Sequence, residues 1–194
     1  MAKAQARGWV HIDGKFTHAG ATETFSQNSG PARGEQTIHI GGTIATVVLI
    51  GDHAYIQGSA AAVTNYFGFP ASDAATLAGK WISIPSTASD FATVSDGVSL
   101  ASALKEVGLD GYLSVTAPSK LAGSTVIGIE GTDASTDSTG GPGTLYISVT
   151  TGLPVEFDST SSQGTEHVVF GDWGKPVALA APAHTVPIAS IPGN

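Results

Sequence analysis

Cysteine is absent from this chain of 194 residues, and charged side chains are scarce. Without cysteine the chain has no disulfide, no thiolate metal ligand and no cysteine nucleophile. Asp, Glu, Lys and Arg together make up 12% of the residues, against about a quarter in an average soluble protein. Ser, Thr and Gly take the place of surface charge. This composition favours a β protein outside the cytoplasm over a helical cytosolic enzyme.

Basic residues and long apolar runs are also few. The 8 Lys and Arg residues stand against 16 Asp and Glu residues, for a formal net charge of −8. A surface that binds the phosphates of a nucleic acid is therefore excluded. The first seven residues are basic, but no apolar run follows them, so they are not an intact signal peptide. No apolar stretch approaches the roughly 18 residues of a membrane span, and the nearest is 44–50.

Alternation of apolar and polar residues predicts strands over most of the chain. Val10, Ile12 and Phe16 share one face of the first strand, with polar residues on the other face. The segment 43–50 is apolar on both faces, so a further layer must cover it. Turn-forming residues separate the strands. We expect strands at 9–17, 22–27, 36–40, 43–50, 53–57, 81–84, 112–115, 124–130, 144–150, 154–159 and 166–170.

Short helical patterns are confined to the middle of the chain. Ser59 precedes a helix predicted over 60–67, and Ser72 precedes one over 73–78. A third helix fits 100–107, with Lys105 and Glu106 facing away from its apolar stripe. Helices this short need support from a sheet. The order of strands, helices and strands predicts one α+β domain in which a single curved antiparallel sheet carries about three short helices on one face.

Four segments, in this order, resemble the LolA-like LppX/LprG-type family of actinobacterial envelope lipoproteins. They are residues 51–58 (GDHAYIQG), 79–85 (GKWISIP), 143–157 (GTLYISVTTGLPVEF) and 170–182 (FGDWGKPVALAAP). The resemblance covers about 9–182. It implies a half-barrel whose concave face, partly covered by helices, forms an apolar cavity for the acyl chains of a lipid or glycolipid. It also implies export to the cell envelope and a lipidated cysteine at the mature N-terminus.

The resemblance divides the chain into three parts. Residues 1–8 are expected to be an N-terminal tail, 9–182 the LppX/LprG-like lipid-binding domain and 183–194 an irregular C-terminal tail. Because the sequence holds no cysteine, membrane association would require an anchor that these residues do not contain. The expected location is the cell envelope or the extracellular space. The sequence leaves the oligomeric state open.

Residues on the inward face of the sheet and on the helices that cover it are the candidates for the wall of the cavity. They are Val10, Ile12, Phe16, Ile38, Ile40, Val47, Leu49, Tyr66, Phe67, Leu100, Leu104, Leu145 and Ile147. Periodicity alone does not separate a lined cavity from a filled one, because the same side chains can interdigitate into a solid core. Two functions therefore stay open: a carrier of amphiphilic lipid, and an envelope interaction or scaffold module with a solid core and no ligand.

Signals for catalysis, metals and cofactors are weak. The six histidines lack paired ligand spacing, and Asp133 and Asp137 are expected to be solvated acids of a glycine-rich loop, 131–143. The sequence has no Gly-x-Ser-x-Gly motif. Its glycines fall at hairpins and helix ends instead of in a phosphate-binding loop. We therefore expect a non-catalytic binding protein with no catalytic residue, no metal and no cofactor.

Overall fold

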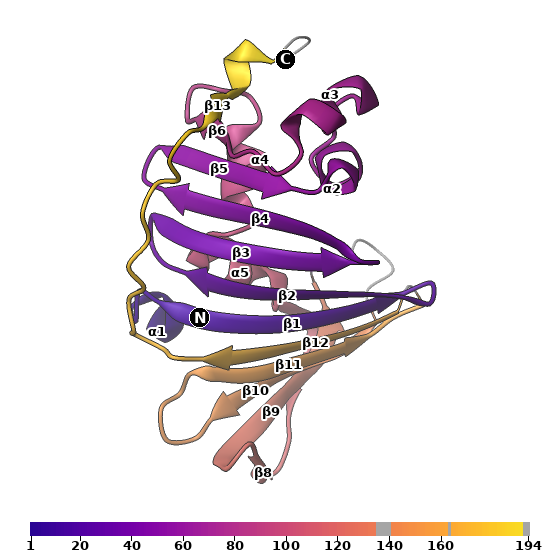
Figure 1. Cartoon of the computed structure of the whole chain (residues 1–194). Helices are drawn as coiled ribbons and strands as arrows, with labels where there is room; N and C mark the ends of the chain where they lie inside the picture. Colours follow the sequence, from indigo (N-terminus) through magenta and orange to yellow (C-terminus); the bar gives the residue numbers. More distant parts are fainter. Residues whose placement is uncertain (135–140, 163, 192–194) are drawn as a thin grey trace.

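The chain folds around one large, open β-sheet. A computed structural model describes residues 1–134, 141–162 and 164–191 (Figure 1). The sheet has thirteen strands in the order β13-β6-β5-β4-β3-β2-β1-β12-β11-β10-β9-β7, and β8 pairs with β9 outside this path. The strands are β1 Val10–His18, β2 Ala21–Ser29, β3 Arg33–Ile40, β4 Thr43–Ile50, β5 His53–Gly58, β6 Ile82–Pro85, β7 Leu109–Val115, β8 Ser119–Leu121, β9 Ser124–Asp133, β10 Pro142–Ser148, β11 Pro154–Thr160, β12 Gly164–Gly171 and β13 Val186–Pro187.

Pairing of β1 with β12 joins the two halves of the sheet. The strands β1 to β5 form one antiparallel meander, β9 to β12 form a second, and β1 lies antiparallel to β12 over eight residue pairs. Within the described residues, only the pair of β13 with β6 is parallel. Figure 1 shows the resulting sheet as a curved, open surface. The expected single curved antiparallel sheet of an α+β domain is confirmed.

The helices are short and lie mainly between β5 and β7 in the sequence. They are α1 Ala2–Gln5, α2 Ala60–Asn65, α3 Ala71–Leu77, α4 Phe91–Asp96, α5 Leu100–Glu106 and the 3-10 helix η1 Ile188–Ser190. In Figure 1, α4 and α5 lie behind the sheet, on its concave side. Ser59 caps α2 as expected, because its side chain accepts a hydrogen bond from the backbone N–H of Ala62. The cap expected from Ser72 is wrong, since α3 follows Pro70 directly, and α4 was not expected at all.

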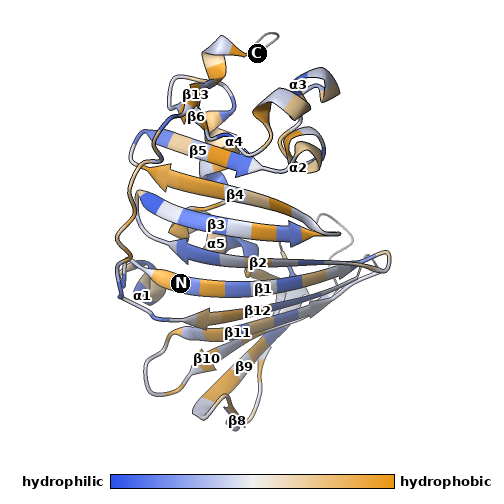
Figure 2. Cartoon of the chain, in the orientation of Figure 1, coloured by the Kyte–Doolittle hydropathy of each residue, from blue (hydrophilic) through white to orange (hydrophobic). Residues whose placement is uncertain are grey.

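Strand register decides which side chains share the concave face. One row across the sheet runs from Ile12 through Gln27, Gln36 and Val47 to Ile56. The row is apolar at both ends and polar in the middle, because β2 and β3 contribute glutamines. Figure 2 shows the same contrast between hydrophobic β4 and the more hydrophilic β2 and β3. The concave face is therefore not uniformly apolar.

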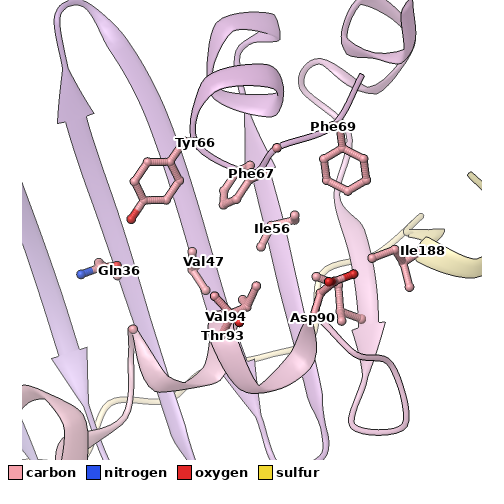
Figure 3. A pocket seen from close by; sticks show the side chains of 13 residues that line it. Gln36, Val47, Ile56, Tyr66, Phe67, Phe69, Asp90, Thr93, Val94 and Ile188 are labelled. Atoms are coloured by element: carbon pink, nitrogen blue, oxygen red, sulfur yellow. The ribbon is translucent and has the colours of Figure 1, made fainter. Parts of the chain in front are cut away.

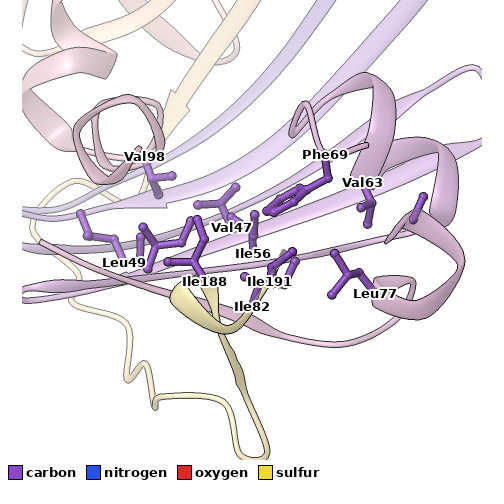
Figure 4. Close-up of a cluster of buried hydrophobic side chains, with 13 residues drawn as sticks. Val47, Leu49, Ile56, Val63, Phe69, Leu77, Ile82, Val98, Ile188 and Ile191 are labelled. Atoms are coloured by element: carbon purple, nitrogen blue, oxygen red, sulfur yellow. The ribbon is translucent and has the colours of Figure 1, made fainter. Parts of the chain in front are cut away.

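Two large clusters of buried side chains pack against the sheet, one toward each end, and are called the upper and the lower cluster. The upper cluster packs β4, β5 and β6 against α2, α3 and the C-terminal segment (Figure 4); it contains Val47, Leu49, Ala54, Ile56, Val63, Phe69, Ala74, Leu77, Ile82, Ile84, Val98, Ile188 and Ile191. The lower cluster packs β1, β10, β11 and β12 against α5; it contains Ala4, Val10, Ile12, Leu100, Leu104, Val107, Leu145, Leu153, Phe157, Val168 and Phe170. A small third group, Ile38, Ala45 and Ala62, lies on β3, β4 and α2.

Both ends of the chain contribute to these clusters, which differs from the expected tails. Ala4 of α1 is buried in the lower cluster. Ile188 and Ile191 are buried in the upper cluster, and the backbone N–H of Val186 donates to the carbonyl of Trp81 over 2.8 Å. The expectation of an irregular tail from 183 onward is thus wrong for 186–191. The prolines of this segment favour irregular structure. Burial of its two isoleucines was therefore not expected from the sequence.

Candidate functional site

Three adjoining cavities follow the concave face of the sheet. The first has a volume of about 400 Å³ and lies between the strands, the segment after α2 and helix α4 (Figure 3). Val47 and Ile56 of the sheet form its floor, Tyr66 and Phe67 lie at one side, and α4 lies opposite with Thr93. Its wall is therefore mostly aliphatic and aromatic. Concave, largely apolar spaces with a few polar groups are the usual form of small-molecule sites.

The second cavity, of about 350 Å³, continues the first toward α5. The two share Gln36, Tyr66 and Gly97 in their walls. Ile12 and Ile38 of the sheet lie on the floor of the second cavity, together with Phe25. The two cavities therefore lie side by side on the concave face.

The third cavity, of about 180 Å³, adjoins the second, and three of its ten wall residues are acidic. Phe16, Glu106 and Glu166 line both. The remaining wall of the third cavity is Thr17, His18, Asp133, Ser159, Ser161, Gly164 and Thr165. This space lies where β1 ends and β12 begins. The share of acidic residues in the wall rises from the first cavity, where Asp90 is the one acid, to the third, where Glu106, Asp133 and Glu166 are acids.

A glycine makes room for an aromatic side chain in the second cavity. Gly14 and Phe25 are paired across β1 and β2. A Cβ atom at Gly14 would lie 2.0 Å from Cε1 of Phe25, so the phenyl ring covers the glycine. The ring also stacks on Phe16 with a centroid separation of 5.6 Å. Any larger residue at position 14 would drive the Phe25 ring away from the strand.

The polar middle of the concave face is hydrogen-bonded internally. Gln36 Nε2 donates to Gln27 Oε1 over 2.7 Å, and Gln27 Nε2 donates to Ser29 Oγ over 2.5 Å. Ser29 Oγ donates to the carbonyl oxygen of Val98, just beyond α4, over 3.0 Å. Gln27 and Ser29 are buried. Buried polar groups that are satisfied in this way fix the positions of their neighbours, so the chain ties the floor of the cavities to the helical layer.

Two acids at the acidic end, Glu166 and Glu106, have raised pKa values. Burial, and then the negative charges of Asp133 and Glu106, raise the pKa of Glu166 to about 8, although a hydrogen bond from Ser159 opposes the change. Partial burial also raises the pKa of Glu106, with Lys105 opposing it and Asp133 adding to it. Burial raises the pKa of Glu23, which lines the second cavity. Removal from water disfavours the charged form of an acid, and so does a like charge nearby.

One sequence expectation about these acids is wrong, and another is incomplete. Glu106 faces away from the apolar stripe of its helix and is exposed, as expected, but it also lines the second and third cavities. Asp133 was expected in a solvated loop, but it ends β9 with 3% of its surface exposed. Asp137, named with it, lies outside the described residues. The error at Asp133 arose because glycines on both sides of it suggested a loop, whereas β9 extends through Gly131.

The thirteen candidate wall residues divide between cavities and packed clusters. Val47, Tyr66 and Phe67 line the first cavity, and Ile12, Phe16, Ile38 and Tyr66 line the second. Leu145 and Ile147 line a separate space of about 190 Å³ near α1. Val10, Leu49, Leu100 and Leu104 are buried in the two large clusters, and Ile40 packs against the third group. The structure therefore brings six of the candidates together around the first two cavities.

Several wall residues were missed. Phe25 and Gln27 alternate with polar residues on β2, so that strand carried no strong apolar face in the sequence. Thr93 and Val94 belong to α4, whose polar composition gave no helical stripe. Ile56 was placed correctly in a strand, and its alternation with Ala54 could have identified it as inward-facing. Glu166 alternates with Val168 and Phe170 on β12, a position that indicates the concave face.

On the convex face, three possible metal ligands lie within 4.8 Å of one another: Glu156, Asp158 and His167. The Nδ1 atom of His167 lies 2.7 Å from Oδ1 of Asp158, which it faces across β11 and β12, and 3.9 Å from Oε1 of Glu156. Partial burial raises the pKa of Glu156, and Asp158 adds to the effect while His167 opposes it. Spacing along the sequence does not reveal this group, because strand pairing creates it. Within this group, His167 and Asp158 already form a hydrogen bond with each other.

None of the helices in the described part of the chain is long and apolar enough to cross a membrane. No protein-family model matches the sequence, and no curated protein matches it either. Solved structures do match. LprF from Mycobacterium bovis is 13% identical and aligns with a TM-score of 0.56 over 94% of this chain and 98% of its own. The lipoprotein LppX from Mycobacterium tuberculosis is 12% identical and aligns with a TM-score of 0.54 over 92% of this chain and 95% of its own. The chain has the fold of the LppX/LprG type.

Proposed function

We propose that the chain is a non-catalytic carrier that holds the acyl chains of an amphiphilic lipid in the first and second cavities. One observation carries the proposal. The first cavity, of about 400 Å³, is walled by Val47, Ile56, Phe67 and Phe69 and adjoins the second, with which it shares three wall residues. The fold is similar to that of the lipoprotein LppX, and four segments of the sequence resemble the same family. Both similarities support the proposal.

The free energy of burying methylenes favours a ligand with more than one acyl chain. Each methylene transferred from water to an apolar wall contributes about 0.8 kcal/mol, so ten methylenes give roughly 8 kcal/mol. Loss of translational and rotational freedom costs at least about 4 kcal/mol. A single short chain therefore binds weakly, whereas two chains bind with submicromolar affinity. We propose lipids with two or more chains as the ligands, and the cell envelope as the place where they are carried.

An interaction module is the second candidate, and one observation favours it. Tyr112, Leu113 and Val115 of the edge strand β7 are exposed, with 92% of the surface of Tyr112 open to solvent. An edge strand with exposed apolar side chains is a common site for pairing with another protein. In that case the work of the protein would lie at β7 and the cavities would hold no ligand.

A titration of the delipidated protein with a fluorescent diacylglycerol tests the first candidate. We expect saturable binding with a stoichiometry of one lipid per chain, and weaker binding of a fatty acid with the same fluorophore. The control is Tyr112→Ser, which changes the β7 surface at a side chain that lines none of the cavities described above. Absence of saturable binding by the parent protein would refute the carrier. Loss of binding in Tyr112→Ser would move the binding site to β7.

A further inference from the structure

We infer that the third cavity receives the headgroup of the bound lipid and selects an uncharged or cationic headgroup over an anionic one. This inference rests on the proposed function. It starts from the share of acidic wall residues, which rises from the first cavity to the third. Acyl chains fit the walls around Val47 and Phe67, and the hydroxyl and carboxyl groups gather at the other end, around Glu166 and Ser159. An amphiphile with its acyl chains at the apolar end and its headgroup at the acidic end therefore binds in one orientation.

The charges around the second and third cavities are almost all negative. The second cavity is lined by the carboxyl groups of Glu23, Asp96, Glu106 and Glu166 and by one amine, Lys105. The third adds Asp133 and His18, which faces it from β1. Lys105 is exposed at the end of α5. An anionic headgroup placed in the third cavity therefore meets three carboxyl groups, and each of them that is ionised repels it, whereas each ionised group attracts a cation.

Glu166 is the centre of this arrangement because other elements pack against it from several sides. Ser159 of β11 donates a hydrogen bond to its Oε2 over 3.4 Å. Asp133 of β9 and Glu106 of α5 act on it through their charges, and Phe16 of β1 lies opposite it in the sheet. The described residues place no lysine or arginine in the wall of the third cavity.

The same geometry gives the selection a pH dependence. The pKa of Glu166 is raised to about 8 by burial and by Asp133 and Glu106. Near neutral pH the group is protonated and both donates and accepts hydrogen bonds, which suits an uncharged headgroup with hydroxyl groups. Above that pKa it is ionised. A cationic headgroup should then bind more tightly as the pH rises, and an anionic one more weakly.

The test compares three lipids with the same two oleoyl chains, each in titrations from about pH 6 to about pH 9. They are dioleoylglycerol, which is uncharged, dioleoyl-trimethylammonium-propane, which is cationic, and dioleoylphosphatidylglycerol, which is anionic. At the upper pH we expect the anionic lipid to bind at least about tenfold more weakly than the uncharged one. We expect Glu166→Gln to reduce that difference to about threefold and to remove its dependence on pH. Asp158→Asn, which removes an equal charge on the convex face, should change neither.

The outcomes separate this inference from the proposed function. If all three lipids bind equally, or if the anionic lipid binds best, the headgroup selection is refuted while the carrier stands. The same holds if Glu166→Gln leaves the difference between the lipids unchanged. If none of the three binds, the carrier itself fails and the selection fails with it. Circular dichroism of each variant at each pH shows that the protein is folded in every titration.

Discussion

Filling the first cavity from α4 should block lipid binding without unfolding the protein. Thr93 of α4 is exposed to solvent, and it also lines the first cavity, opposite Val47 (Figure 3). In Thr93→Trp the indole group extends into that space. If it displaces about three methylenes of an acyl chain, the loss is about 2.4 kcal/mol, or about fiftyfold in dissociation constant. The free energy of unfolding should change by no more than about 0.5 kcal/mol, because helix α4 buries none of its residues.

The matched control is Ala92→Trp on the same helix. Ala92 is exposed and does not line the cavity. Both variants are compared with the parent by titration with fluorescent diacylglycerol and by thermal melting. Ala92→Trp should bind as the parent does. If Thr93→Trp also binds as the parent does, the acyl chains do not occupy the first cavity. If both variants lose affinity equally, the cause is a change in α4 and not the volume of the cavity.

Three other changes test the packing and the electrostatics. Because the pKa of Glu166 is raised to about 8 from 4.5, its contribution to stability is complete below about pH 4.5 and is lost as the pH rises through about 8; the melting temperature should therefore fall over that range, and Glu166→Gln should flatten the curve. Leu104→Ala should lower the free energy of unfolding by about 2–5 kcal/mol and leave the affinity for lipid unchanged, because Leu104 is buried in the lower cluster and not in a cavity wall; urea titration and lipid titration measure the two quantities. Ile191→Ala should destabilise the protein by about 2–4 kcal/mol in the same urea titration, and a change below 0.5 kcal/mol would show that the C-terminal segment does not belong to the upper cluster.

The sheet was predictable because its strands obey simple local rules. Val10 and Ile12 alternate with polar residues, and glycine turns such as Gly41-Gly42 end one strand and begin the next. The family resemblance added the half-barrel curvature of the sheet and the position of the helices on its concave face. Local rules failed at 186–191, because burial of Ile188 and Ile191 depends on a sheet edge contributed by β6, a hundred residues earlier.

The site was harder to predict than the sheet. Alternation marked Val47 and Leu49 as inward-facing, and both belong to the upper cluster, yet Val47 lines a cavity and Leu49 does not. The difference comes from what lies above each side chain, and periodicity does not contain that information. The acidic end depends on three elements that meet only in the folded chain: α5 with Glu106, β9 with Asp133 and β12 with Glu166. In the sequence each of these acids looks like an ordinary solvated residue.

The most direct measurement of the central claim is the position of the acyl chains in a crystal of the complex. A diacylglycerol with brominated chains gives anomalous scattering peaks at the bromine atoms. We predict peaks on the concave side of the sheet, beside Val47, Ile56 and Phe67, with the glycerol toward Glu166. Peaks on the convex face or along β7, with the cavities closed by side chains, would contradict the account.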